Sequence, residues 1–240
     1  MLKRCTTFLY KSTTSYQQIW SLQQALHQQQ LSGADPRNIL IVCQHHLVYT
    51  GGRKTKLDQI PDNIEVIRVE RGGQITCHAP GQLVFYPLLN LRRFRMDLRW
   101  YVSTLEQIII NTLASYDVKA HRHKSYPGVW VASDKIATVG ISCSRWLTMH
   151  GFALNVNPNL SHFDHIIPCG ISREEGYNIT SMEKLCKTEL LDLQEVTDRI
   201  LIEFQALFDV QCDIVDANLQ TPVLVSNSEP TPDWSLQSRL

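Results

Sequence analysis

Apolar residues recur every three to four positions in three stretches of the chain, and this spacing predicts amphipathic helices. The clearest stretch is DLRWYVSTLEQIIINTLASY at positions 97–116, where Asp97 is placed to cap the first turn. LQEVTDRILIEFQALF at positions 193–208 and SYQQIWSLQQALHQQQ at positions 15–30 also read as helices. The chain is therefore expected to form one helix near its start, one near its middle and one toward its end.

Short runs rich in β-branched and aromatic residues predict strands. They are CTTFLY, NILIVCQ, EVIRVE, QLVFYPLLNL, GVWVA, KIATVGISCS and MHGFALNVN. Most of them fall between the first and the last helix, which predicts an α+β fold. We expect a single domain over residues 1–216, with a mixed, largely antiparallel sheet flanked by helices. Residues 217–240 are rich in Ser, Pro, Thr and Asn and are expected to be a disordered tail.

The composition excludes several classes of partner. The formal net charge is +0 and the pI is about 7.1, so nucleic acid is not an expected partner. No apolar run is long enough to cross a bilayer, so no membrane role is expected. The 7 cysteines are odd in number and form no CxxC pair, which is typical of reduced thiols. A cytoplasmic location is predicted, with the plastid stroma or the mitochondrial matrix as the alternative, because the acid-free, basic start is faintly typical of a transit peptide.

The stretch ERGGQITCHAPGQLVFYP, at positions 70–87, is the first that does not look like scaffold. The two glycines after Arg71 let a loop pass close to a ligand, and His78 stands before a Pro-Gly turn. The spacing of a phosphate-binding loop is absent. The plainer interpretation is a tight turn with an incidental histidine.

The stretch SDKIATVGISCSRWLTMHGFALNVN, at positions 133–157, offers a wall for an apolar ligand. Thr138–Gly140 and Gly151–Ala153 are small or apolar strand segments that suit a chain-like apolar ligand and equally suit an ordinary core. Asp134 and Lys135 look like a turn before a strand. A lysine in that place is usually a solvated surface charge.

The heptapeptide IIPCGIS, at positions 166–172, presents a cysteine between a proline and a glycine. Pro168 fixes its own backbone and Gly170 clears space beside the sulfur, so Cys169 is built for display rather than packing. A thiol reacts as its thiolate, which a nearby cation favours, and His162, His165 and Lys135 are the candidate neighbours. A zinc site on His162, His165 and Cys169 is an alternative without an evident fourth ligand, so no metal is expected.

These stretches carry a resemblance to a known family. RGGQITCHAPGQLVFYPLLNLRR, GVWVASDKIATVGISCSRWLTMHGFALNVN and HIIPCGI stand in the order found in lipoyl(octanoyl) transferases, and the resemblance covers roughly residues 5–210. That family shares a superfamily with biotin and lipoate ligases, which implies a biotin/lipoate protein ligase-like fold. One departure is Ala79, which stands where the family usually has glycine.

The resemblance implies an acyltransferase that needs no cofactor. It would take an octanoyl group from octanoyl-acyl carrier protein, hold it as a thioester on Cys169, and pass it to a lysine of a lipoyl domain. The acceptors would be lipoyl domains of 2-oxoacid dehydrogenases and the glycine cleavage H protein. Lys135 would be the catalytic partner of Cys169. The implied substrate-binding residues are Arg71, Gly72, Gly73, Gln74, Ile75, Thr76, Cys77, His78, Thr138, Val139, Gly140, Gly151, Phe152 and Ala153.

Three other functions compete with this reading. An ATP-dependent lipoate or biotin ligase needs no nucleophilic cysteine, so the PCG sequence argues against it. A non-catalytic acyl-binding module needs neither Lys135 nor Cys169. A thiol hydrolase would need His78 or His165 as its base. If the transferase reading holds, Lys135, Cys169 and the Arg71–His78 loop should converge on one pocket, with Leu154 as a further lining residue.

Overall fold

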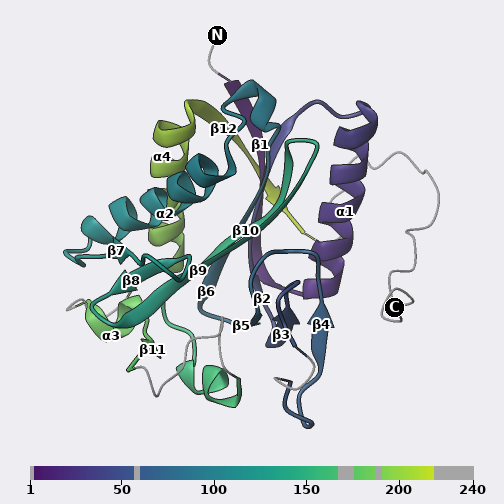
Figure 1. Ribbon diagram of the computed structural model, residues 1–240. Helices are drawn as coiled ribbons and strands as arrows, with labels where there is room; N and C mark the ends of the chain where they lie inside the picture. The colour runs from purple at the N-terminus through teal and green to yellow at the C-terminus, as the bar shows by residue number, and fades with distance from the viewer. Residues whose placement is uncertain (1–2, 57–59, 167–175, 187–190, 219–240) are drawn as a thin grey trace.

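A computed structural model of the protein describes residues 3–56, 60–166, 176–186 and 191–218. A large mixed sheet forms the middle layer (Figure 1). Helix α1 (Tyr16–Ser32) covers one face of this sheet, and helices α2 (Leu98–Ala114) and α4 (Leu193–Phe208) cover the other. The α+β class and the mixed sheet flanked by helices are confirmed.

Nine strands make up the large sheet. Their order is β12 (Val210–Ala217), β1 (Lys3–Thr14), β2 (Asn38–His45), β6 (Gln82–Leu88), β10 (Leu147–Asn155), β9 (Asp134–Ser144), β8 (Val129–Val131) and β7 (His121–Arg122). Strand β11 (Asn178–Ile179) pairs in parallel with the start of β9, and β1 is parallel to both of its neighbours. The other pairings are antiparallel, as expected.

A second, 3-stranded sheet lies beside the large one. Its strands run in the order β4 (Val66–Arg68), β3 (Val48–Gly51) and β5 (Ile75–His78). The short elements are the helix α3 (Met182–Leu185) and the 3-10 helices Leu91–Arg93 and Leu160–His165. The small sheet carries the Arg71–His78 loop between β4 and the end of β5, and thereby holds that loop against β9.

The three predicted long helices form where the apolar period placed them. Asp97 caps α2, because its carboxylate accepts hydrogen bonds from the backbone N–H groups of Arg99 and Trp100. Helix α1 ends at Gly33, whose φ of 81° is a left-handed conformation that favours glycine. Among the described residues, no helix is both long and apolar enough to span a bilayer.

The two faces of the large sheet bury different kinds of side chain. Alternation along β10 sends Phe152 and Leu154 into the core under α2 and α4, while Met149 and Ala153 face α1. Large apolar side chains dominate the α2 side, whereas the α1 side of β9 and β10 carries small residues. This asymmetry leaves room for a cavity on the α1 side.

Strand β12 is an element that the sequence pattern did not predict. It runs beside β1 at the edge of the sheet and leaves Ile214 and Val215 49% and 36% exposed. Its last residue, Ala217, lies one position beyond the expected end of the domain at residue 216. Residues 219–240, most of the expected tail, lie outside the described part of the chain.

Candidate active site

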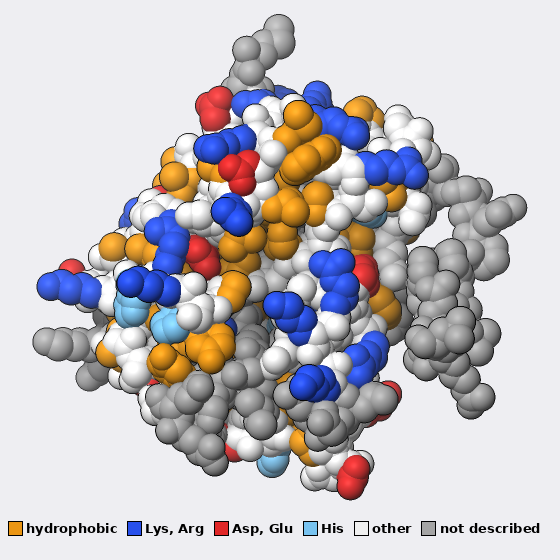
Figure 2. Space-filling view, viewed as in Figure 1, with side chains coloured by type: hydrophobic (Ala, Val, Ile, Leu, Met, Phe, Trp, Pro, Cys, Tyr) orange, Lys and Arg blue, Asp and Glu red, His pale blue; other side chains and the backbone are white. Residues whose placement is uncertain are grey.

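A cavity opens on the α1 side of β9 and β10 and encloses about 390 Å³, including its mouth. In Figure 2, the visible face of the molecule has a hollow near its centre, between basic and apolar side chains. The cavity is lined by Tyr16, Arg71, Thr76, His78, Val84, Tyr86, Thr138, Val139, Gly140, His150, Gly151, Phe152 and Ala153. The structure therefore brings together three members of the Arg71–His78 loop and both strand segments that the sequence pointed to.

The floor of the cavity is made of small residues that face one another across strands. Gly140 pairs with Gly151, and Thr138 pairs with Ala153. A Cβ atom at Gly151 would collide with the carbonyl oxygen of Phe85, so this position requires glycine. Because no large side chain rises from this floor, the cavity forms a trough along the Thr138–Gly140 part of β9. Such a trough suits a linear acyl chain.

Leu154 does not line this trough. Its side chain points to the opposite face of the sheet and is fully buried in the core under α2 and α4. The strand period places Ala153, rather than its neighbour, on the cavity side.

The Arg71 side chain holds its own loop in shape. Its guanidinium donates to the backbone oxygens of Gly72 (3.0 Å) and Gln74 (2.9 Å), and to that of Thr50 on β3 (2.8 Å). The Gly72 N–H donates to the Ile141 oxygen on β9 at 2.8 Å. Backbone groups of Gly72, Gly73 and Gln74 thus fix the loop against β3 and β9, and none of the three lines the cavity.

The Arg71–His78 segment divides its side chains between two environments. Thr76 and His78 face the cavity, because alternate residues of β5 point the same way. Ile75 and Cys77 point away and are fully buried in a third apolar cluster with Ala79, Phe163 and Ile166. Ala79, the departure from the family pattern, packs there with 2% of its surface exposed and lies outside the cavity lining.

His78 is linked to the start of β9 by a chain of hydrogen bonds. Its Nδ1 lies 2.7 Å from Gln82 Oε1, and Gln82 Nε2 donates to Asn155 Oδ1 at 2.8 Å. Asn155 donates to the Thr180 oxygen, and the Thr180 N–H donates to the Lys135 oxygen, both at 3.0 Å. Because Gln82 Oε1 can only accept, Nδ1 of His78 carries the proton and Nε2 is an acceptor. Burial lowers the pKa of His78 to about 3, so the ring is neutral near pH 7.

Several polar residues that line the cavity had no clear sequence signal. Tyr16 stacks on His78 with ring centres 5.7 Å apart, and the Tyr86 hydroxyl lies 2.9 Å from His45 Nε2. Burial lowers the pKa of His45 to about 4. His150 is 1% exposed and adopts a φ of 57°, which is uncommon for a residue with a side chain. Only its position directly before a required glycine hinted at a special role.

Lys135 is buried, so its interpretation as a surface charge was wrong. Its side chain is 1% exposed, and Nζ lies 5.1 Å from the centre of the Trp130 ring. Glu106 of α2 is close enough for the Lys135 charge to lower the pKa of its carboxyl, although burial, the larger effect, raises that pKa. The expected turn is also displaced: Ala132, with a φ of 50°, turns the chain, and Asp134 and Lys135 already belong to β9.

Cys169 lies outside the described residues, but the structure places both flanks of its segment. On one side, Ile166 packs in the cluster that holds Cys77. On the other, Asn178 and Ile179 pair with Asp134 and Lys135, and Ile179 also packs against that cluster. His162 and His165 lie in the 3-10 helix Leu160–His165, which directly precedes Ile166. The backbone oxygen of His162 accepts a hydrogen bond from the Tyr49 hydroxyl at 3.0 Å.

Sequence comparison gives a consistent set of relatives. Residues 15–205 match the model of the lipoyl protein ligase A/B catalytic domain. An octanoyltransferase of Gloeobacter violaceus is 41% identical over 201 residues, which cover 82% of this chain and 88% of that protein. The chloroplastic octanoyltransferase LIP2p2 of Arabidopsis thaliana is 36% identical and covers 88% of this chain and 81% of its own length.

Solved structures support the same fold. A putative lipoate protein ligase from T. acidophilum superposes with a TM-score of 0.68 at 13% identity, over 91% of this chain and 90% of that one. Lipoate-protein ligase A bound with ATP gives a TM-score of 0.68 at 16% identity, over 90% of each chain. At these identities the likeness establishes the arrangement of the sheet and helices alone.

Proposed function

Because this chain belongs to the family of lipoyl protein ligase A/B catalytic domains, we propose that it is an octanoyltransferase acting in protein lipoylation. The observation that carries the proposal is the trough along β9, which is floored by small residues and bordered by the Arg71 loop. An acyl chain lying in this trough would run beside β9, whose second residue is Lys135; Lys135 itself precedes the part of β9 that lines the cavity.

The proposed donor and acceptors are those that the family resemblance implies. We propose octanoyl-acyl carrier protein as the donor, and lysines of the lipoyl domains of 2-oxoacid dehydrogenases and of the glycine cleavage H protein as acceptors. A thioester donor brings the acyl group already activated, and transfer from one thiol to another is close to balanced in energy. The acyl group then keeps enough reactivity to acylate an amine without ATP.

Cys169 is the proposed nucleophile. Its thiolate attacks the thioester carbonyl carbon, the carrier thiol leaves, and a new thioester forms on the protein. The acceptor amine then attacks this carbonyl, an amide forms, and the Cys169 sulfur leaves as a thiolate while the amine loses a proton. Covalent catalysis of this kind divides the transfer into two easier steps.

The described flanks support a position for Cys169 near Lys135. Three residues span at most about 11 Å of chain, which limits how far Cys169 can lie from Ile166. That cluster also contacts Ile179, which pairs with Lys135. In this proposal, the Lys135 ammonium favours the Cys169 thiolate in the first step, and a neutral Lys135 accepts the proton of the acceptor amine in the second.

An intact mass measurement tests the proposal directly. The full chain is incubated with octanoyl-acyl carrier protein without ATP, and one octanoyl adduct is expected on the wild type and none on Cys169→Ala. Cys143→Ala is the matched control, because Cys143 is a partly exposed thiol on β9 itself. An adduct on Cys169→Ala, or one that maps to Cys77 or Cys143, would show that the nucleophile is another residue.

The same reaction mixture separates the competing functions. A ligase would acylate a lipoyl domain from free octanoate only when ATP is added, an outcome worth testing because lipoate-protein ligase A bound with ATP shares the fold. A thiol hydrolase would release octanoate without an acceptor, and a binding module would form no adduct. We also propose a cytoplasmic location, with the plastid stroma or mitochondrial matrix as alternative results of imaging a fluorescent fusion.

A further inference from the structure

The cavity on β9 has a polar end where several buried side-chain atoms lack a hydrogen bond within the described part of the protein. In the described part of the chain, nine buried side-chain nitrogen and oxygen atoms lack a hydrogen bond. Four of them belong to cavity-lining residues: Nε of Arg71, Oγ1 of Thr76, and Nδ1 and Nε2 of His150. Buried polar atoms are nearly always hydrogen-bonded, so this concentration in one cavity points to something that occupies it.

The register of the strands places these groups at one end of the trough. His150 pairs with Ile141, and Ile141 accepts the Gly72 N–H, so His150 and the Arg71 loop meet at the same level of β9. Lys135 is at the other end. The Lys135 side chain extends along β9 toward Gly140, because its Cε would stand 3.1 Å from a Cβ added at Gly128, beside the Val129–Ala137 pair. An acyl chain held beside Lys135 therefore points its methyl end at the polar groups.

His150 is held in an unusual conformation at this end. Its φ is 57°, its backbone N–H donates to Gln23 Oε1 at 3.0 Å, and its ring is 1% exposed. Nε2 lies 3.4 Å from Glu70 Oε1 without the alignment of a hydrogen bond. Residues kept in sparsely populated backbone regions concentrate at functional sites. This backbone conformation places a polar ring in the lining of the cavity.

We propose that Arg71, Thr76 and His150 form a polar, hydrated terminus of the acyl trough that limits the length of the chain it accepts. This inference rests on the proposed octanoyl transfer. An eight-carbon chain ends before these groups and leaves their water in place. A longer chain pushes methylenes against them and strips that water without replacing its hydrogen bonds. Each buried group left unsatisfied in this way costs about one to two tenfold steps in affinity.

The proposal predicts a specific ranking of ligands. Decanoic acid should bind the full-length Cys169→Ala protein more weakly than the burial of two additional methylenes would predict. ω-Hydroxydecanoic acid carries a hydroxyl where the chain meets the polar end, so it should bind about tenfold more tightly than decanoic acid. In water-exposed binding the added hydroxyl would give no such gain. Titration calorimetry with octanoic, decanoic and ω-hydroxydecanoic acids measures all three affinities.

Thr76→Val tests the origin of the effect, because valine keeps the shape of threonine and removes the hydroxyl. This variant should lose most of the tenfold preference for the hydroxylated chain and should transfer decanoyl groups better relative to octanoyl. Thr76→Ser keeps the hydroxyl and should retain the wild-type ranking. Thr138→Val is the matched control: it makes the same change in the same cavity, at a half-buried position nearer Lys135, and should also keep the ranking.

Two results would overturn the polar terminus while leaving octanoyl transfer intact. One is equal affinity of the wild-type trough for decanoic and ω-hydroxydecanoic acids. The other is the same shift in ranking for Thr138→Val as for Thr76→Val, which would reveal a general change in cavity polarity. If the wild type transfers no octanoyl group and binds no octanoic acid, the proposed function itself fails and this inference falls with it.

Discussion

Replacing Lys135 by methionine should abolish acyl transfer without weakening the fold. Lys135 is 1% exposed, and its charge lies near the Trp130 ring and Glu106. Burying an ammonium costs several kcal/mol, and no ion pair within 4 Å offsets this cost for Lys135 among the described residues, so an apolar residue of similar volume should remove about 2 kcal/mol of that cost. The lost contact with Trp130 offsets up to about 2 kcal/mol. The free energy of unfolding is therefore expected to change by no more than about 2 kcal/mol in either direction.

Glu106 does not become an unpaired charge in this variant. Its carboxylate lies 3.2 Å from Arg122 and accepts the Gly128 N–H at 2.9 Å. Without Lys135, the pKa of Glu106, already raised by burial, rises further. A carboxyl with a raised folded pKa binds its proton more tightly when folded, so it loses stability as pH rises through that pKa. The gain from Lys135→Met should therefore be larger near pH 5 than near pH 8.

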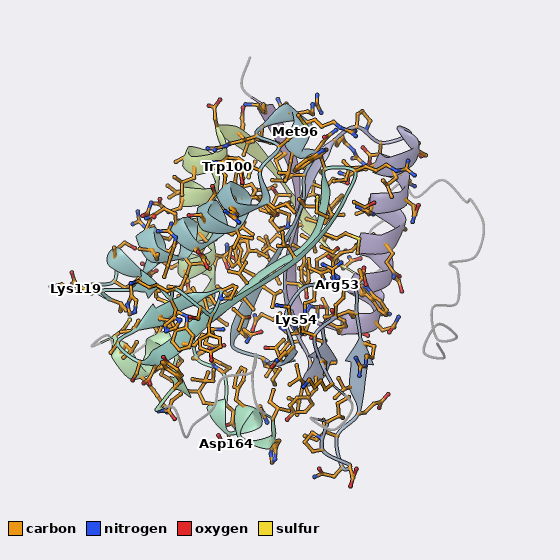
Figure 3. The ribbon with its side chains drawn as sticks, in the orientation of Figure 1. Arg53, Lys54, Met96, Trp100, Lys119 and Asp164 are labelled. Carbon is orange, nitrogen blue, oxygen red and sulfur yellow. The ribbon has the colours of Figure 1, made fainter. Side chains whose placement is uncertain are left out.

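Urea unfolding and single-turnover mass measurements check this prediction together. Lys119→Met is the control for stability, because Lys119 is exposed at the edge of the molecule (Figure 3) and its replacement should change stability by less than about 0.5 kcal/mol. Lys135→Arg separates the two proposed steps: it keeps a cation but cannot act as a base, so it should form acyl-enzyme and discharge it slowly. Lys135→Met that unfolds more easily than the wild type by over 3 kcal/mol would refute the argument from buried charge. Normal acyl transfer in the same variant would refute the catalytic role.

Two further changes test the trough and its buried histidines. Gly140→Val should shift the preference toward shorter acyl chains, because a Cβ at Gly140 would stand 3.2 Å from Arg71 Cδ inside the cavity. The affinity for a longer chain should fall about tenfold for every one to two methylenes displaced. Ser142→Val, on the same face of β9 but outside the cavity lining, should leave the preference unchanged, and acyl-chain competition assays compare the two variants. Burial lowers the pKa of His45 to about 4 and that of His78 to about 3, so the free energy of unfolding should fall as pH drops below their unfolded pKa of 6.5. The free energy of unfolding in urea should be lower near pH 5 than near pH 7 by roughly 2 kcal/mol per histidine. Equal values at the two pH values would contradict the burial of these rings in the neutral form.

Local signals were sufficient for the helices and for the loops of the site. The helical spacing of apolar residues in α2 and its cap at Asp97 both come from one short stretch of sequence, and both predictions are confirmed. Strand β12 was missed because it is an edge strand with Ile214 and Val215 partly exposed, so it shows no clean alternation of buried and exposed residues. A sequence pattern reveals a strand when buried and exposed residues alternate, and most side chains of β12 are at least partly exposed.

The burial and orientation of residues whose environment comes from distant parts of the chain could not be predicted from the local pattern. Lys135 is buried because Trp130 of β8 and Glu106 of α2 pack around it, and neither is implied by the residues next to Lys135. His150 lines the cavity because its backbone turns to a φ of 57° and its N–H binds Gln23 of α1. Glycines and prolines mark where a loop can approach a ligand, but they do not tell which polar side chains meet it there.

Strand β9 ties both ends of the acyl trough to one rigid element. Its start pairs with β11, just after the Cys169 segment, and its Ile141 end is bonded to the Arg71 loop. A strand inside an antiparallel sheet cannot change its length, so the distance from the reacting end to the polar end is set by the backbone. A glycine inserted after Gly176, an exposed residue with a φ of 79° and no crowding around it, should disturb the nucleophile and not this distance. Acylation should slow while the ratio of octanoyl to decanoyl transfer stays at its wild-type value, as a single-turnover assay with both donors would measure. A changed ratio would mean that chain length is read at the Cys169 end, and β9 would then be only a wall.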